Sequence, residues 1–121
     1  EAEPADLYAM AEKLKPLRDE GVLIVGSGNV VHNLRRVEWD NPGGSKQTEA
    51  FNADVVQAVV ARDDEAVIHW ESNPNADYAV PTPDHFLPLI MCLGAAQDEN
   101  AKVFNDVCNL GAIAMTGFFF G

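Results

Sequence analysis

Two histidines stand in sequence contexts that could deliver an imidazole to a chemical site. The first, His32, follows the segment Gly26-Ser27-Gly28-Asn29. Glycines would let the backbone turn tightly after a buried strand and leave His32 at the carboxyl edge of a sheet, where ligands bind in open α/β folds. From these residues alone, a histidine that packs and hydrogen-bonds within a loop is an equally good interpretation.

The second candidate, His85, lies where the sequence predicts the first turn of a helix. Thr82 can cap that helix, and Pro83 suits its first position. The positive end of the helix dipole disfavours a protonated imidazole, and the neutral imidazole is the form that binds a metal ion. A capping or packing role is the alternative for His85. His69, beside Trp70 in a possible strand, is better explained as a core or surface residue.

Other kinds of catalytic site find little support in the sequence. The glycine spacing resembles a dinucleotide-binding fingerprint, but Val31 occupies the place of the third glycine. Ser27 lies between two glycines, which is not the pattern of a nucleophile elbow. The acidic run at residues 63–65 is typical of a helix end and not of a metal site.

The hydrophobic pattern predicts a layered α/β structure that could bring the two histidines together. Val22–Val25 is continuously apolar and rich in β-formers, which indicates a strand buried on both faces, as in a parallel sheet. We therefore expect a mixed or mostly parallel sheet that is flanked by helices and incomplete in this chain. The expected helices cover residues 5–20 (kinked or ended early by Pro16), 48–62 and 82–94; the expected strands cover 22–25, 102–108 and 112–120; and polar loops cover 41–45 and 71–80.

The overall composition narrows the possible partners. The 121 residues suffice for one domain, and their formal net charge of −11 disfavours binding to nucleic acid or to anionic membranes. No apolar run approaches the roughly 18 to 20 residues that a membrane span requires. Cys92 and Cys108 stand in apolar contexts outside any C-x-x-C pair, so two free thiols in a reducing cytoplasm are favoured over a disulfide.

Three segments resemble one known family, the class III extradiol ring-cleavage dioxygenases of the LigB superfamily, in its DOPA 4,5-dioxygenase-like branch. They are residues 21–35 (GVLIVGSGNVVHNLR), 80–89 (VPTPDHFLPL) and 110–117 (LGAIAMTG). Family members are longer, and their first half carries further metal-binding histidines in motifs such as Gly-His-Gly-Ser and Ser-Ala-His-Trp, which this chain lacks. The resemblance therefore implies that residues 1–121 are the C-terminal half of a LigB-like dioxygenase domain.

The same resemblance implies a non-haem metal site. The family position that matches His85 is a metal ligand, and the position that matches His32 lies beside the metal as a ligand or as the acid–base residue. We therefore predict that His85 and His32 bind Fe(II), with Zn(II) able to occupy the site in isolated protein. The implied substrates are a catechol and O2. His32 would accept a catechol proton and later return one during ring opening.

Three residues near His32 in the sequence could complete its surroundings. Asn29, Asn33 and Arg35 are predicted to orient His32 or to bind the substrate. A catalytic iron needs a third protein ligand, so the expected source is the missing N-terminal half or a partner chain. Two alternatives stay open: a LigB-like fragment that lost catalysis with that half, and a metal-binding subunit that pairs with a second chain.

Overall fold

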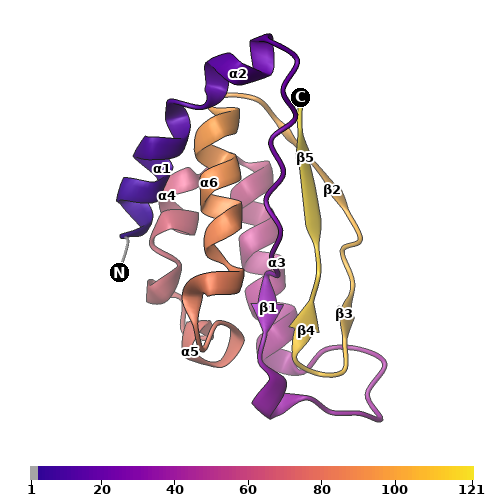
Figure 1. The fold of residues 1–121 in the computed structure, drawn as a ribbon. Helices are drawn as coiled ribbons and strands as arrows, with labels where there is room; N and C mark the ends of the chain where they lie inside the picture. The colour runs from indigo at the N-terminus through magenta and orange to yellow at the C-terminus, as the bar shows by residue number, and fades with distance from the viewer. Residues whose placement is uncertain (1–2) are drawn as a thin grey trace.

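The computed structural model describes residues 3–121, in which helices pack beside short strands (Figure 1). None of the helices in this range is long and apolar enough to cross a membrane. The α/β class predicted from the sequence is confirmed.

The helices are α1 (Pro4–Glu12), α2 (Lys15–Asp19), α3 (Lys46–Val60), α4 (Asp64–Ile68), α5 (Ala76–Ala79) and α6 (Leu87–Ala96). The strands are β1 (Val31–His32), β2 (Ala101–Phe104), β3 (Cys108–Asn109), β4 (Ile113–Ala114) and β5 (Gly117–Phe120). Short 3-10 turns are η1 (Leu34–Arg36), η2 (Trp70–Ser72) and η3 (Pro83–His85).

The strands form two small antiparallel sheets. β4 lies between β1 and β3 in the first sheet, and β2 pairs with β5 in the second. Among the described residues, the only parallel pairing is an isolated bridge between Gly44 and Gly111. The expected mostly parallel pairing is not adopted, because the strands from β2 to β5 follow one another through connections too short for a parallel crossover.

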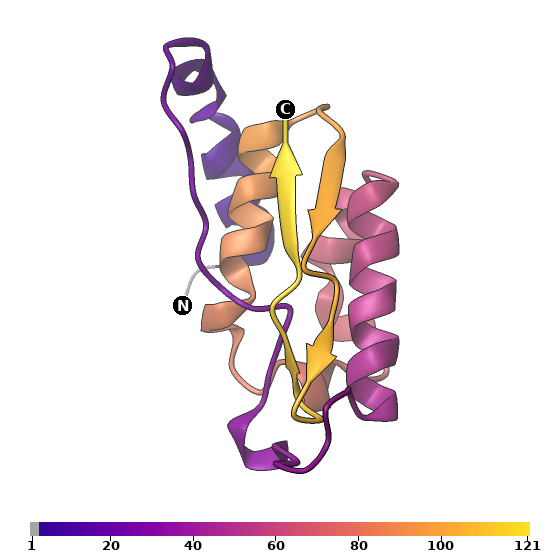
Figure 2. The same ribbon diagram turned by 90° about the vertical axis from the view of Figure 1, so that its right-hand side faces the viewer.

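The run at residues 22–25, predicted as a buried strand, is neither paired nor buried. Residues 22–29 belong to no helix or strand, and the side chains of Leu23 and Val25 are 77% and 75% exposed. Figure 2 shows this run as an extended segment that passes beside α6 and stands apart from β5. A strand needs a hydrogen-bonded neighbour, and residues 3–121 provide none for this run.

The first two predicted helices follow local sequence signals. The helix expected at residues 5–20 is divided into α1 and α2, and Pro16 stands in the first turn of α2, where its missing N–H is not needed. α3 begins close to its predicted start, because the Ser45 hydroxyl accepts a hydrogen bond from the Thr48 N–H at 3.2 Å. The sequence therefore located both segments, and the proline decided the break in the first.

Later boundaries differ more from the prediction. α6 begins at Leu87, because residues 83–85 form the separate turn η3, and it continues to Ala96. The expected loop at 71–80 contains η2 and α5. The expected strand at 102–108 is divided into β2 and β3, with Asn105 between them in the left-handed region at φ 53°. The acidic run lies at a helix end, as predicted, but it begins α4, a helix that the sequence did not predict, with Asp63 as its cap.

The hydrophobic core lies between α3, the α6 helix and the first sheet. Phe51 on α3 and Phe86, just before α6, are fully buried. The Phe86 ring lies 5.9 Å from that of Phe51 and 5.3 Å from that of Trp70, measured between centroids. Because Phe86 directly follows His85, this aromatic cluster fixes the chain at the second candidate histidine.

Candidate metal centre

The structure brings the two candidate histidines together. The ring centroids of His32 and His85 are 3.9 Å apart, and their planes are inclined by 34°. The rings come from β1 and η3, which are distant in the sequence. Two imidazoles in contact form a compact pair of nitrogen donors of the kind that binds divalent transition metals.

Pairing with β4 positions His32. Val31 pairs with Ala114 and His32 with Ile113. The Asn33 N–H continues the pairing by donating to the Ala112 carbonyl at 3.2 Å. Since the Val31 side chain is fully buried, the alternation of a strand directs the next side chain, His32, to the opposite side.

Two glycines bring the His32 segment against the His85 segment. The Asn29 N–H donates to the His85 carbonyl at 2.8 Å. A Cβ atom at Gly28 would lie 2.2 Å from the His85 carbonyl oxygen, and one at Gly26 would lie 2.6 Å from the Cys92 sulfur. The predicted tight turn at these glycines is therefore wrong. The glycines serve close approach between two backbones, which only residues without a side chain permit.

Asp84 is a neighbour of the histidine pair that the sequence interpretation missed. Its Oδ2 atom lies 3.4 Å from Nε2 of His85. A hydrogen bond from the Thr82 side chain is the main cause that lowers the pKa of Asp84, and the two histidines act in the same direction. A carboxylate beside an imidazole commonly orients it for metal binding. The adjacency of Asp84 and His85 in the sequence was the available signal.

The three predicted accessory residues differ in their surroundings. Asn33 is buried; its Nδ2 donates to the Tyr78 carbonyl at 2.6 Å, and its Oδ1 accepts from the Arg35 N–H at 3.1 Å. Both polar atoms of Asn33 thus hold the turn after His32. Asn29 is half-buried and contacts His85 through its backbone. Arg35 is exposed in η1, and within the described range its guanidinium makes no hydrogen bond.

The third histidine, expected as a core or surface residue in a possible strand, lies at the surface, directly after α4 and not in a strand. His69 is 68% exposed, with Nε2 3.2 Å from a carboxylate oxygen of Glu65. Over residues 3–121, no three His, Cys, Asp or Glu side chains gather closely enough to enclose a metal ion. The donor types of His32 and His85 fit iron or zinc, but two imidazoles are fewer protein ligands than such an ion requires.

Comparison with known proteins identifies the family. The model of the catalytic LigB subunit of aromatic ring-opening dioxygenases matches residues 2–121. The chain belongs to the LigB family. Its relatives place it in the branch that resembles 4,5-DOPA dioxygenases. It is 37% identical to the 4,5-DOPA dioxygenase extradiol of Escherichia coli K12 over 94 residues, and 38% identical to the enzyme of that name from Beta vulgaris over 96 residues.

These matches cover only part of each relative. The two alignments include 73% and 78% of this chain but 34% and 35% of those proteins, so the chain aligns with about a third of their length. The solved structure of an uncharacterized E. coli K12 protein resembles the chain with a TM-score of 0.87 at 29% identity. That likeness includes 99% of this chain and 51% of the E. coli chain. We call the remainder of that E. coli chain the uncovered half.

Proposed function

We propose that residues 1–121 are the C-terminal half of an extradiol dioxygenase domain that opens a catechol-type ring with O2 at a non-haem metal site in the cytoplasm. The observation that carries the proposal is the contact between the His32 and His85 rings, with centroids 3.9 Å apart. Membership of the LigB family supplies the class of reaction. A chance meeting of the chain's two candidate ligand histidines is a weaker explanation.

In this proposal His85 and His32 hold the metal ion, with Fe(II) as the native ion and Zn(II) as a possible substitute in purified protein. A third ligand comes from polypeptide that this chain does not include, since no third His, Cys, Asp or Glu among the described residues joins the pair in a group that could hold a metal ion. The bound iron would supply a path for electrons between the catechol and O2. Asp84, 3.4 Å from Nε2 of His85, would orient that ring.

His32 would also move protons at the catechol hydroxyl, through a ring nitrogen that does not bind the metal. Histidine suits this task because its side chain titrates near neutral pH. β1 holds the backbone of His32 by pairing with β4, so the ring can exchange a proton without losing its place. Asn33 would keep the following turn in position through its two hydrogen bonds. Asn29 and the exposed Arg35 would contact the substrate.

A chimera tests the proposal. This chain would replace the region that it matches in the E. coli 4,5-DOPA dioxygenase extradiol, which restores a full-length domain. We expect the chimera to consume O2 with DOPA or with another catechol. His85→Ala and His32→Ala should each reduce the rate at least about 100-fold, which is within the range for loss of an acid–base or metal-binding group. His69→Ala is the matched control and should change the rate less than about twofold.

The metal content of the same variants separates the remaining alternatives. Equal rates in the chimera and its His85→Ala and His32→Ala variants would refute the site assignment. Iron binding that depends on both histidines, without O2 consumption for any catechol, would favour the metal-binding subunit. A chimera that folds but neither binds iron nor consumes O2 would favour a fragment that has lost catalysis.

A further inference from the structure

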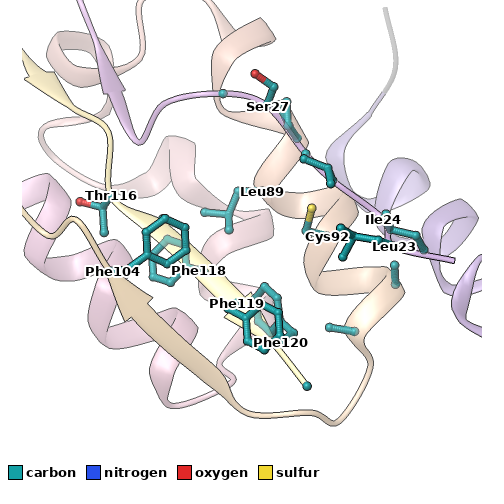
Figure 3. Close-up of a pocket in the computed structure, with 18 of the residues that line it drawn as sticks. Leu23, Ile24, Ser27, Leu89, Cys92, Phe104, Thr116, Phe118, Phe119 and Phe120 are labelled. Carbon is teal, nitrogen blue, oxygen red and sulfur yellow. The ribbon is translucent and has the colours of Figure 1, made fainter. Parts of the chain in front are cut away.

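An open groove runs between the extended segment and the second sheet. Residues 22–30 form one side, β5 and Phe104 form the other, and α6 lies beneath through residues such as Leu89 and Cys92. Figure 3 shows Leu23 and Ile24 on one side, the phenylalanines of β5 on the other, and Leu89 and Cys92 from α6. The groove has a volume of about 880 Å³, and His85 is among its lining residues. We refer to it as the open groove.

The extended segment has the side-chain pattern of a strand in a covered sheet. Added Cβ atoms at Gly26 and Gly28 would meet α6 and η3, so residues 24, 26 and 28 face the helix. Leu23 and Val25, which alternate with them, face away and are mostly exposed. Exposed β-branched and aliphatic side chains on a helix-backed segment indicate that a second layer covers it.

The backbone edges that face the open groove, from residues 23–28 and from β5, lack a hydrogen-bonded neighbouring strand. The structure shows no backbone–backbone hydrogen bond for residues 23–28, whereas the N–H groups of Val22 and Asn29 at the ends of this segment donate to the carbonyls of Leu17 and His85. β5 pairs with β2 only, and both ribbon views show it running antiparallel to the extended segment across the groove (Figures 1 and 2). Two facing edges whose N–H and C=O groups lack backbone partners match an extended peptide and not a compact small molecule. The Phe120 carbonyl at the end of β5 accepts a side-chain hydrogen bond from Arg18 at 2.9 Å.

The exposed face of the second sheet also indicates that further polypeptide covers this region. Phe104 and Phe119 lie on one face of the β2–β5 pair, because their partners in the register are Gly117 and Lys102. These two rings are 58% and 52% exposed. The opposite face carries Phe118 and Phe120, which pack against the core. An apolar sheet face of this kind requires cover by further polypeptide.

We infer that the open groove is the docking site of the half-domain that this chain lacks, which enters as at least one extended strand between residues 23–28 and β5. The uncovered half of the solved E. coli chain supplies the argument for this occupant: the likeness at a TM-score of 0.87 includes 51% of that chain and leaves the rest unmatched. The inference concerns assembly of the domain and does not depend on a metal ion or on ring cleavage.

Co-expression tests the docking. The 121-residue chain would be produced with the uncovered half as a separate, tagged polypeptide and purified in EDTA without a catechol. We expect a 1:1 complex by light scattering. Hydrogen exchange at the amides of residues 23–28 should be at least about tenfold slower than in the chain alone, because those N–H groups gain acceptors. The amides of β5 whose N–H groups face the groove should slow as well.

Variants of the chain distinguish docking of a strand from non-specific hydrophobic association. Val25→Pro removes an N–H that has no partner in the isolated chain and should weaken the complex at least tenfold while leaving the thermal midpoint of the chain unchanged. Leu23→Glu should weaken it similarly, because it places a charge under the covering layer. Val60→Glu on α3, where Val60 is also half-exposed, is the matched control and should bind normally.

Three results would overturn the inference. One is the absence of a complex. Another is a complex in which residues 23–28 exchange as fast as in the free chain. The third is equal protection of these amides in the chain alone at high concentration, which would assign the groove to a second copy. Because no metal is present, these failures are distinct from a failure of O2 consumption in the chimera.

Discussion

Residues 22–28 and 29–33 follow one another in the sequence, yet the two parts have opposite surroundings. In the second part, Val30, Val31 and Asn33 are buried, and their backbone pairs with residues 112–114. In the first part, residues 23–28 make no backbone–backbone hydrogen bond, and the side chains of Leu23 and Val25 face solvent. An apolar run therefore forms a strand only where a neighbouring strand can pair with it, as β4 does with β1.

The histidine pair is held by contacts within this chain, whereas we infer that the open groove is completed by another polypeptide. The histidine pair rests on contacts within the chain: the strand pairing of His32, the bond from Asn29 to the His85 carbonyl, and the buried ring of Phe86. The open groove has one wall without pairing and a sheet edge without a neighbour. We therefore expect substitutions around the histidine pair to lower the stability of the isolated chain, and substitutions of the exposed side chains along the groove to leave that stability almost unchanged.

The largest contrast is expected between two phenylalanines. Phe86→Ala removes a fully buried ring beside His85 and should lower the free energy of unfolding by about 3 to 5 kcal/mol. Phe119→Ala removes a half-exposed ring on the open face and should lower it by less than about 1 kcal/mol. Urea denaturation of the isolated chain measures both. Similar losses for the two variants would contradict the division into a completed site and an open groove.

Glycine substitutions test the close approach between the histidine segments. In Gly28→Ala the new Cβ would overlap the His85 carbonyl oxygen at 2.2 Å, so the variant should lose about 1 to 3 kcal/mol through displacement of backbone. In Gly43→Ala the nearest atom would be 3.6 Å away, and the change should stay within about 0.5 kcal/mol. Urea denaturation midpoints of the two variants measure these changes. A Gly28→Ala protein as stable as the unchanged chain would show that the contact is dispensable.

Two asparagines predicted for the same role should differ in the same assay. Asn33→Ala removes the donor to the Tyr78 carbonyl and the acceptor of the Arg35 N–H, which should cost about 1 to 2 kcal/mol. Asn29→Ala keeps the backbone bond to His85, and its side chain makes no hydrogen bond in the described part of the chain, so a change below about 0.5 kcal/mol is expected. The reverse order would assign the structural role to Asn29.

The smallest effect is expected far from both regions, at Tyr8. Burial and the hydrogen bond to Asp64 raise the pKa of Tyr8 to about 12 from its ordinary value of 10.0. Between these two pH values the unfolded chain releases the phenol proton while the folded chain retains it, so stability falls as pH rises. Thermal midpoints measured from pH 9 to 11 should fall less steeply in Tyr8→Phe. An equal slope in both proteins would contradict the raised pKa.

The sequence predicted the elements whose signals are local. Ser45 and Asp63 cap helices where side-chain oxygens can accept backbone N–H groups, and Pro16 marks the break between α1 and α2. The division of the C-terminal strands was not predicted. It depends on the left-handed residue Asn105 and on pairings between strands, which a single apolar pattern does not specify.

For the site, the sequence by itself indicated two candidate ligands: His32 after a glycine segment, and His85 in what was predicted as the first turn of a helix. Only the tertiary structure decided that their rings meet at 3.9 Å, that the glycines serve contact instead of a turn, that Asp84 lies beside the pair, and that Asn33 is occupied with the backbone. The reason is physical. Residue type and spacing fix local geometry, whereas contacts between distant segments depend on how the whole core packs.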